Sequence, residues 1–143
     1  MFLLDTHVVS ELRKVRAGKA NPQVAAWADR VDADDLYLSV VTLQELETGV
    51  LLIERRDENQ GAVLRTWFDS HVLPAFAGRI LPVTEAVARR SAHLHVPQPR
   101  PFCDSLIAAT ALEHQMTVVT RNVVDFASTG VLLVNPWDAQ PAP

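Results

Sequence analysis

The sequence predicts an α/β domain in which helices cover both faces of a parallel sheet. Short apolar runs of strand length alternate along the chain with longer segments of helical periodicity. The run Val131–Val134 is apolar at every position, which is typical of a strand buried on both faces of a parallel sheet. At 143 residues the chain forms one ordinary domain, which we expect over residues 1–137, followed by a loose tail over 138–143.

The first part of the chain predicts two strands and three helices. An apolar run ends at Asp5 and passes into helical periodicity, and Asn21-Pro22 supplies the cap and first-turn proline that begin a helix. Thr42 and Glu45 have the spacing of a capping box, and Gly49 would let another backbone approach closely. The expected elements are a strand at 2–4, a helix through Val8, Val9 and Leu12, a helix over 22–31, a strand at 36–41 and a helix from Thr42 to about Arg56.

Prolines mark several boundaries in the rest of the chain. Pro74 is expected to stop a long helix, and the segment 97–101 carries three prolines that make it a stiff connector. Thr84 before Glu85 predicts another helix start. The expected elements are a helix over about 58–73, a strand at 79–82, helices over 84–94 and 103–114, and strands at 117–120 and 131–134 separated by a polar turn.

Composition narrows the classes of protein to consider. No apolar run reaches the roughly 18 residues of a membrane helix, and the N-terminus lacks the basic region and cleavage site of a signal peptide, so we expect a cytoplasmic protein. The single cysteine, Cys103, excludes an internal disulfide and a cysteine-rich zinc site.

The net charge of −4 argues against a protein that coats nucleic acid through bulk positive potential. Basic residues nevertheless cluster at 13–19, at Arg55–Arg56 and at Arg89–Arg90. Two interpretations stay open for these clusters, a local basic rim around an acidic centre and an ordinary solvated surface.

Two aspartates stand at positions where a carboxylate is chemically informative. Asp5 ends the first strand, at the edge of the sheet where ligands bind in open α/β folds, although a lone aspartate there could equally cap the next helix. Asp104 shares a helical stripe with Ile107, Ala108 and Ala111. A carboxylate on a core-facing stripe needs a cation, a metal or several donors, since burying it unpaired costs several kcal/mol.

Further oxygen ligands are expected near the same edge. Glu45 lies in the first turns of its helix, where the alternative role is the capping box. Asn122 and Asp125 follow the strand at 117–120, and each either supplies an oxygen or only shapes the turn.

Carboxylates gathered without a neighbouring lysine form an oxygen-only site, which selects a hard cation such as magnesium or manganese. The two lysines, Lys14 and Lys19, do not follow strands. Such ions catalyse phosphoryl chemistry, so the predicted reaction is in-line hydrolysis of a phosphodiester.

Five segments together resemble the successive motifs of PIN-domain VapC toxins, particularly the FitB-like ones. They are Leu3-Leu4-Asp5-Thr6, Thr42-Leu43-Gln44-Glu45-Leu46-Glu47-Thr48-Gly49, Cys103-Asp104-Ser105-Leu106-Ile107-Ala108-Ala109-Thr110-Ala111, Val119-Thr120-Arg121-Asn122-Val123-Val124-Asp125-Phe126 and Asn135-Pro136-Trp137. Their order and spacing cover the chain nearly end to end.

This resemblance implies a three-layer α/β/α sandwich and a magnesium-dependent ribonuclease, the toxin of a toxin–antitoxin pair. By position, Asp5 and Asp104 would be the principal metal ligands, Glu45 a third acidic member and Thr6 a supporting hydroxyl. The implied partners are an RNA substrate, a small VapB-like antitoxin that covers the active site and a second copy of the chain, with a larger toxin–antitoxin assembly beyond the dimer.

The chain departs from its relatives at two positions. His7 stands where many relatives have an asparagine, and Asn122 stands where some place a fourth acid directly after Thr-Arg. Asp125 would then act through water, or a second metal ion would bind weakly.

Two other functions would also place an aspartate at the end of the first strand. A phosphatase or phosphoacceptor domain would need a second aspartate two residues after Asp5 and a strand-end lysine, whereas this chain has His7 and no such lysine. A PIN-fold binding module without activity is the alternative that Asn122 favours. His93 and His95 are interpreted as surface residues and Cys103 as a small packed residue, while Trp27, Trp67 and Trp137 are assigned to core or interface.

Overall fold

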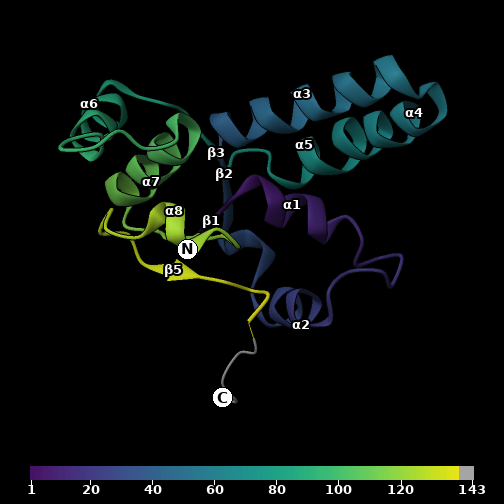
Figure 1. Ribbon diagram of the computed structural model, residues 1–143. Coiled ribbons are helices and arrows are strands. Elements are labelled where there is room, and N and C mark those ends of the chain that lie inside the picture. The colour runs from purple at the N-terminus through teal and green to yellow at the C-terminus, as the bar shows by residue number, and fades with distance from the viewer. Residues whose placement is uncertain (139–143) are drawn as a thin grey trace.

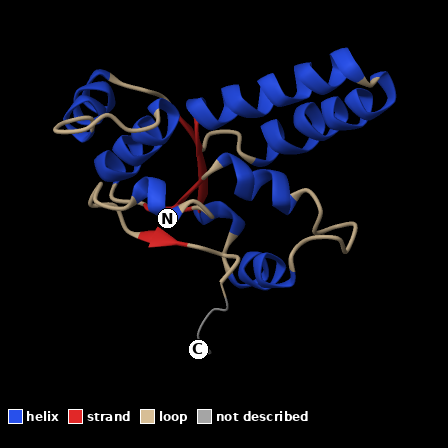
Figure 2. Cartoon of the chain, in the orientation of Figure 1, coloured by secondary structure: helices blue, strands red, loops and turns tan. Residues whose placement is uncertain are grey.

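A five-stranded parallel sheet forms the centre of the computed structural model, which describes residues 1–138 (Figures 1 and 2). The strand order is β3-β2-β1-β4-β5. The strands are β1 (Phe2–Leu4), β2 (Leu36–Ser39), β3 (Ile80–Leu81), β4 (Thr117–Val119) and β5 (Leu133–Val134). The helices are α1 (Thr6–Leu12), α2 (Pro22–Arg30), α3 (Val40–Arg56), α4 (Glu58–Trp67), α5 (Leu73–Ala75), α6 (Glu85–Leu94), α7 (Phe102–His114) and α8 (Val123–Phe126), with the short helical turns η1 (Ala33–Asp35) and η2 (Phe68–Val72).

Each face of the sheet is covered by its own hydrophobic core. In β1, Leu4 belongs to the core shared with α1 to α4, whereas Leu3 belongs to the core shared with α7 and α8. The paired strand β4 divides in the same way, because Val119 aligns with Leu4 and Val118 with Leu3. Alternating side chains of the central strands therefore point into two separate cores, which confirms the predicted three-layer α/β/α sandwich.

Several predicted helix starts are present. The side chain of Asn21 accepts hydrogen bonds from the backbone N–H groups of Gln23 and Val24, with Pro22 in the first turn of α2. Thr84 caps α6 through the N–H of Val87. Helix α1 follows β1 directly, so the strand delivers Asp5 to the first turn of a helix.

The start of α3 differs from the prediction. The strand ends at Ser39 instead of Val41, and the Ser39 hydroxyl caps the helix by accepting from the N–H of Val41 at 3.0 Å. Thr42 is therefore inside the helix and buried, and its hydroxyl has no hydrogen-bond partner among the described residues. The capping box of Thr42 and Glu45 does not form, which leaves Glu45 without that structural role.

Three further boundaries were predicted incorrectly. The helical path continues through Pro74 to Ala75, because the five-residue π-helical turn η2 precedes the proline and a wider turn relieves its clash with the preceding carbonyls. The last strand is limited to Leu133–Val134. The polar turn after β4 contains the short helix α8, which buries Phe126 against α7.

The hairpin of α3 and α4 is packed closely at a glycine other than the predicted one. Gly49 is exposed, and a Cβ built there would meet no atom within 4 Å. At Gly61 a Cβ would lie 2.5 Å from the Cα of Glu54. Arg65 holds the same pair of helices by ion pairs to Glu47 at 2.7 Å and to Glu54 at 2.8 Å.

No helix among residues 1–138 is both long and apolar enough to cross a bilayer. The tail expected over 138–143 lies outside the described residues apart from Asp138, whose backbone N–H donates to the carbonyl of Asn135 at 3.2 Å.

Candidate active site

The fold brings four chain segments to one edge of the sheet. Asp5 follows β1 and Thr120 follows the neighbouring β4, while the first turns of α3 and α7 carry Glu45 and Asp104 toward the same region. Asp5 is only 4% exposed, Asp104 is partly buried and Glu45 is exposed. This edge is where ligands bind in open parallel sheets, so these side chains form the candidate site.

Asp5 is fixed by hydrogen bonds to both of its carboxylate oxygens. The N–H of Thr6 donates to Oδ1 at 2.8 Å, and the Thr120 hydroxyl donates to Oδ2 at 2.8 Å. The Thr6 hydroxyl in turn donates to Oε1 of Glu45 at 2.7 Å. Thr6 therefore joins two carboxylates that lie far apart in sequence, and Asp5 both caps α1 and belongs to the acidic group.

Among the acids of this group, the carboxyl of Asp104 has a strongly raised pKa. Partial burial and the neighbouring charges of Asp5, Asp125 and Glu45 raise the pKa of its carboxyl to about 6, with His7 opposing the shift. Within residues 1–138 the carboxylate of Asp104 forms no hydrogen bond or ion pair. A carboxylate in this position would be stabilised by a cation, because the charges of three acids act on it and His7 opposes them only in part.

The donor set fits a hard divalent cation in its chemistry. Every acidic side chain of the group offers oxygen, and among the described residues none of these four carboxylates is paired with lysine or arginine. Among residues 1–138, no three His, Cys, Asp or Glu side chains are already arranged as ligands of a single ion. Magnesium does not require such a cage, since it is held by one or two carboxylates together with waters and substrate phosphate.

The two candidates for a fourth acidic position occupy different places. Asp125 lies in α8 and is exposed, yet its charge contributes to the raised pKa of Asp104. Asn122 is bound through its backbone N–H, which donates to the Thr120 hydroxyl at 3.0 Å, and its side chain does not cap α8. Asp125 is thus electrostatically part of the acidic group, whereas the Asn122 side chain borders it.

Thr120 is a residue of the site that the sequence does not indicate. It is completely buried, and its hydroxyl connects the Asn122 backbone to Asp5. A threonine after a strand carries no local signal for this role, because the partner carboxylate is 115 residues away.

His95 was assigned to the surface, but it is partly buried and hydrogen-bonded. Its Nδ1 accepts from the N–H of Arg100 at 3.1 Å, so Nε2 carries the proton and donates to the Ser105 hydroxyl, which lies 3.0 Å away. Ser105 also accepts from Ser91 at 3.0 Å. These bonds tie the proline-rich connector to the turn of α7 that presents Asp104.

Trp27 and Cys103, which the sequence assigns to packing, have structural roles. Trp27 is buried and meets the Phe2 ring edge-on, with 5.7 Å between centroids. Cys103 packs beside the core of α7, and burial together with the charges of Glu45 and Asp104 raises the pKa of its thiol, which makes it a poor nucleophile.

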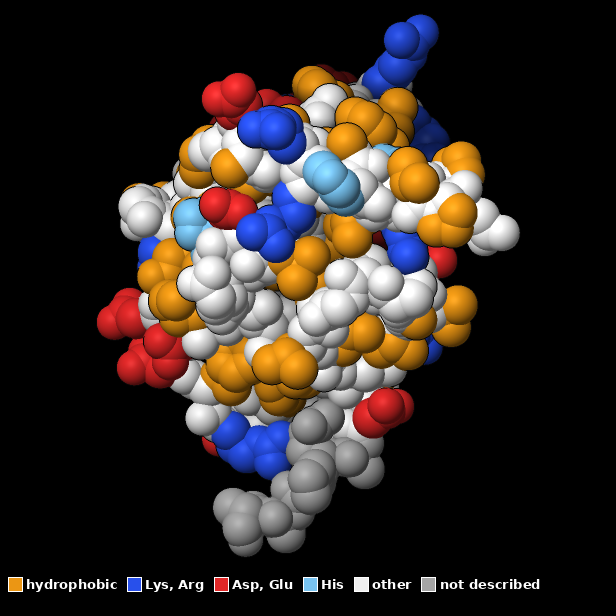
Figure 3. All heavy atoms as spheres, turned by 90° about the vertical axis from the view of Figure 1, so that its left-hand side faces the viewer, with side chains coloured by type: hydrophobic (Ala, Val, Ile, Leu, Met, Phe, Trp, Pro, Cys, Tyr) orange, Lys and Arg blue, Asp and Glu red, His pale blue; other side chains and the backbone are white. Residues whose placement is uncertain are grey.

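The predicted basic clusters separate into two kinds. Arg90 pairs with Glu113 at 3.1 Å on the face of α6 and α7, where basic, histidine and hydrophobic side chains are interspersed (Figure 3). Arg55 and Arg56 are exposed in the last turn of α3. Arg13, Lys14 and Arg16, by contrast, line hollows beside α1.

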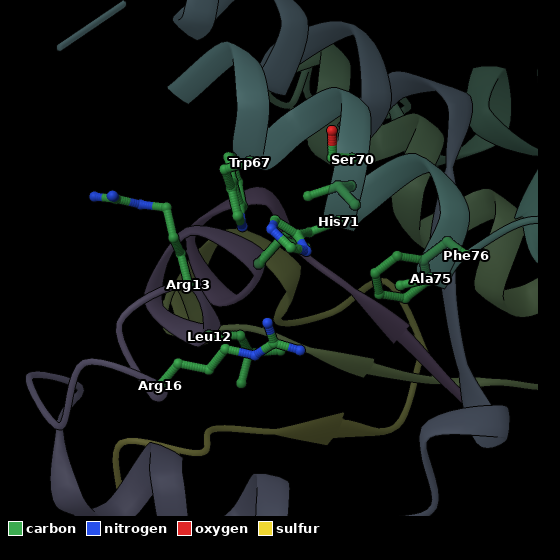
Figure 4. A pocket seen from close by; sticks show the side chains of 10 residues that line it. Leu12, Arg13, Arg16, Trp67, Ser70, His71, Ala75 and Phe76 are labelled. Atoms are coloured by element: carbon green, nitrogen blue, oxygen red, sulfur yellow. The ribbon is translucent and has the colours of Figure 1, made fainter. Parts of the chain in front are cut away.

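One of these hollows is an apolar groove between α1 and the segment from α4 to α5 (Figure 4). Leu12, Trp67 and Phe76 contribute its apolar lining, while Arg13, Arg16 and His71 bring positive or titratable groups to it. The Arg13 guanidinium lies 5.9 Å from the centre of the Trp67 ring. The groove is thus apolar in its lining and basic along its sides.

Comparison with known proteins gives a family match over most of the chain. Residues 2–131 match the PIN domain. The chain is similar to toxin FitB of Neisseria gonorrhoeae, with 40% identity over 96% of this chain and 99% of FitB. It is also similar to VapC ribonuclease Y4jK of Sinorhizobium fredii, with 34% identity over 96% of this chain and 99% of the relative.

Solved structures agree with these sequence relatives. A chain of FitAB bound to an IR36 DNA fragment superimposes with a TM-score of 0.88 at 37% identity and covers 99% of both chains. A chain of FitAcB from Neisseria gonorrhoeae gives a TM-score of 0.86 at 38% identity, covering 96% of this chain and 99% of the other.

Proposed function

The chain belongs to the PIN-domain family, as its motifs predicted, and on that premise we propose that it is a metal-dependent ribonuclease and the toxin of a toxin–antitoxin pair. The observation that carries the proposal is the convergence of acidic charge on Asp104, whose carboxyl is affected by Asp5, Asp125 and Glu45 and has no ion pair with lysine or arginine among the described residues. The names of two full-length relatives, a toxin and a VapC ribonuclease, support the same activity.

Each residue of the site has a distinct part in this proposal. Asp5 and Asp104 would hold a magnesium ion, with manganese as the alternative, and Glu45 would contribute directly or through water. When bound, such an ion lowers the pKa of a coordinated water and neutralises charge that develops on the phosphate. Thr6 and Thr120 fix the orientation of Asp5, and Thr6 holds Glu45 at the same time. Asp125 contributes negative charge from α8.

Cleavage of RNA by purified protein tests the proposal. Total cellular RNA is incubated with antitoxin-free protein in magnesium or in chelator, and the cut ends are mapped. We expect cleavage in magnesium only, and its loss in Asp5→Asn and Asp104→Asn. The matched control is Asp29→Asn, which changes an exposed aspartate of α2 and should cleave like the wild type.

Intact RNA in both solutions, from protein shown to be folded, would contradict the nuclease and favour a PIN-fold binding module. Asn122 is the feature that favours this second function, because it stands where some relatives have an acid.

We propose a small antitoxin as the protein partner, in a cytoplasmic setting. The relative FitB was solved within FitAB, which supports a complex of this kind. The groove of Figure 4 suits a partner segment that carries both apolar side chains and acids, because Trp67 and Phe76 line the same groove as Arg13 and Arg16. Expression of the chain alone should arrest growth, and co-expression of its antitoxin should restore it. Trp67→Ala should weaken that rescue without reducing RNA cleavage.

We also propose that the chain forms a homodimer, with higher toxin–antitoxin assemblies built on it. Sedimentation equilibrium of the purified chain should give twice the monomer mass. A monomeric mass across the micromolar range would contradict this part of the proposal alone.

A further inference from the structure

A second, polar hollow of about 440 Å³ lies beside the acidic group. His7 and Lys14 line it from α1 and the turn that follows, Arg121 and Asn122 from the segment after β4, and Trp137 from the segment after β5. The hollow is therefore built from the same strand-end segments as the candidate active site.

Hydrogen bonds connect this polar hollow to Asp5. The Asn122 N–H donates to the Thr120 hydroxyl at 3.0 Å, and that hydroxyl donates to Oδ2 of Asp5 at 2.8 Å. On the opposite wall, His7 lies close enough to Asp104 to oppose the rise in its pKa. A ligand in the hollow would thus lie next to whatever the carboxylates hold.

The free donors of Arg121 are the central feature of the hollow. Its guanidinium carbon lies over the Trp137 ring, 5.1 Å from the ring centre, which restrains the guanidinium beside the aromatic face. Within residues 1–138 this guanidinium has no hydrogen-bond acceptor and no ion pair. An arginine that is oriented by an aromatic ring while its N–H groups stay available is prepared for a ligand with anionic oxygens.

The one acid in the hollow already has partners. Glu11 accepts from the N–H of Asn21 at 3.0 Å and from Lys14 at 3.3 Å, and these bonds, together with the charges of Lys14 and Arg121, lower the pKa of its carboxyl. Its side chain is 14% exposed, against 46% for Lys14. Glu11 is thus the more enclosed member of its pair, and Lys14 and Arg121 leave positive charge facing the hollow.

We propose that this polar hollow binds one unpaired nucleotide of the RNA substrate, next to the phosphate that is cut. Arg121 and Lys14 contact its phosphate, and the base stacks on the Arg121 guanidinium that rests on Trp137. Single-stranded RNA is commonly recognised by bases stacked on aromatic rings or guanidinium planes, and the volume matches that of small-molecule sites. This inference rests on the proposed ribonuclease function, for which it names the strand type and a positioning residue.

Binding measured without cleavage tests the inference. A labelled eight-nucleotide single-stranded RNA is titrated with the full chain in chelator, and fluorescence anisotropy gives the Kd. Arg121→Ala should raise the Kd about tenfold, as loss of one stacked base and one phosphate contact would. Arg121→Lys should recover only part of this, because lysine keeps the charge but cannot stack. Arg56→Ala, which removes an exposed arginine at the far end of α3, should stay within about twofold.

Cleavage kinetics in magnesium supply a second readout. For Arg121→Ala we expect a higher KM and a kcat within about a factor of two, because the substitution removes binding outside the reacting group. Circular dichroism shows whether the variant is folded, and the lysine variant replaces it if it is not.

The two proposals fail in different ways. If wild type cuts RNA but Arg121→Ala binds the oligonucleotide as Arg56→Ala does, the nucleotide site is wrong and the nuclease stands. If no protein cuts RNA but the binding difference persists, the nuclease fails and the nucleotide site stands. If Arg121→Ala loses only antitoxin binding, the hollow serves the protein partner and the inference is overturned.

Discussion

The raised pKa of Asp104 makes the free energy of unfolding depend on pH. Its folded-state pKa of about 6 lies above the ordinary value of 3.8, so between these values the folded chain binds more protons than the unfolded chain. The free energy of unfolding therefore falls as the pH rises through this window, and the metal-free protein is destabilised at neutral pH by the charge that the proposed cation would neutralise.

Asp104→Asn should therefore stabilise the metal-free protein at pH 7.5, by about 1 kcal/mol once solvent screening of a half-buried group is allowed for. Urea unfolding in chelator at pH 7.5 and pH 5 measures it, and the difference between variant and wild type should shrink at pH 5. A variant less stable than wild type at pH 7.5 would show that Asp104 is held by favourable contacts instead.

Thr120→Val keeps the shape of a buried residue and removes the hydroxyl that serves Asp5 and Asn122. We expect a loss of about 1–2 kcal/mol in unfolding free energy, because a buried acceptor and a backbone donor lose their partner, together with weaker magnesium binding by calorimetry. Thr117→Val, in the strand β4 that precedes Thr120, is the control, since its hydroxyl forms no hydrogen bond within residues 1–138. Equal effects of the two substitutions would remove the special role of Thr120.

At the scale of single residues, the sequence predicted where the carboxylates lie better than which residues hold them in place. Asp5 could be placed because it ends an apolar run, and Asp104 because a charge on a core-facing stripe is unusual. Thr120 and His95 could not be assigned, because their partners are brought to them by the fold and leave no local pattern.

Among the elements, the α3–α4 hairpin has the sharpest geometric requirement. Gly61 packs against the backbone of Glu54, and that contact cannot move aside as a flexible side chain would. In a sequence, a glycine indicates only that a side chain is missing. The sequence therefore could not show that the close contact lies at Gly61 and not at Gly49. Which glycine faces another helix depends on the rotation of both helices, and this is a property of the packed pair.

We expect Gly61→Ala to destabilise the protein by about 2 kcal/mol or more, since the helices must separate to admit the methyl group. Gly49→Ala should instead stabilise it by roughly 0.5–1 kcal/mol, because the site is open and alanine favours the helix. Thermal unfolding of both variants measures the contrast, and a shift in the same direction for both would contradict the assigned packing.

At the start of α3, the fold selects one of two possible capping residues. Ser39 and Thr42 are both good capping residues, and the sequence favoured Thr42 because Glu45 follows at the right spacing. The fold uses Ser39, whose pairing in the sheet ends the strand there. The earlier start leaves Glu45 free of the capping box, and its side chain bonds to Thr6 instead.

For the molecule as a whole, charge placement matters more than net charge. The chain carries −4 overall, yet Lys14 and Arg121 face the polar hollow beside the acidic group. RNA binding through two phosphate contacts should give a slope of about −1.4 for log K against log salt, and Arg121→Ala should lower its magnitude by about 0.7. Anisotropy titrations between low and moderate salt measure the slopes, and a salt-independent affinity would exclude phosphate contacts as the main source of binding.

The overall architecture was the most predictable level. Alternating strand and helix patterns with strands apolar on both faces determine a parallel sheet covered on two sides, and short connections leave few topologies. Boundaries near Pro74 and in the segment after β4 could not be read in the same way, because a π-helical turn and a one-turn helix depend on contacts that local patterns do not encode.

The hydrogen bond between Thr120 and Asp5 spans 115 residues and joins the central strand to a late one. During translation the ribosome delivers β1 first and β4 only after most of the chain has been synthesised. An unfinished chain that stops before β4 therefore lacks one of the two strands that pair with β1, together with the hydroxyl that supports Asp5. Such a product cannot complete the candidate active site, which becomes whole only late in the synthesis of the chain.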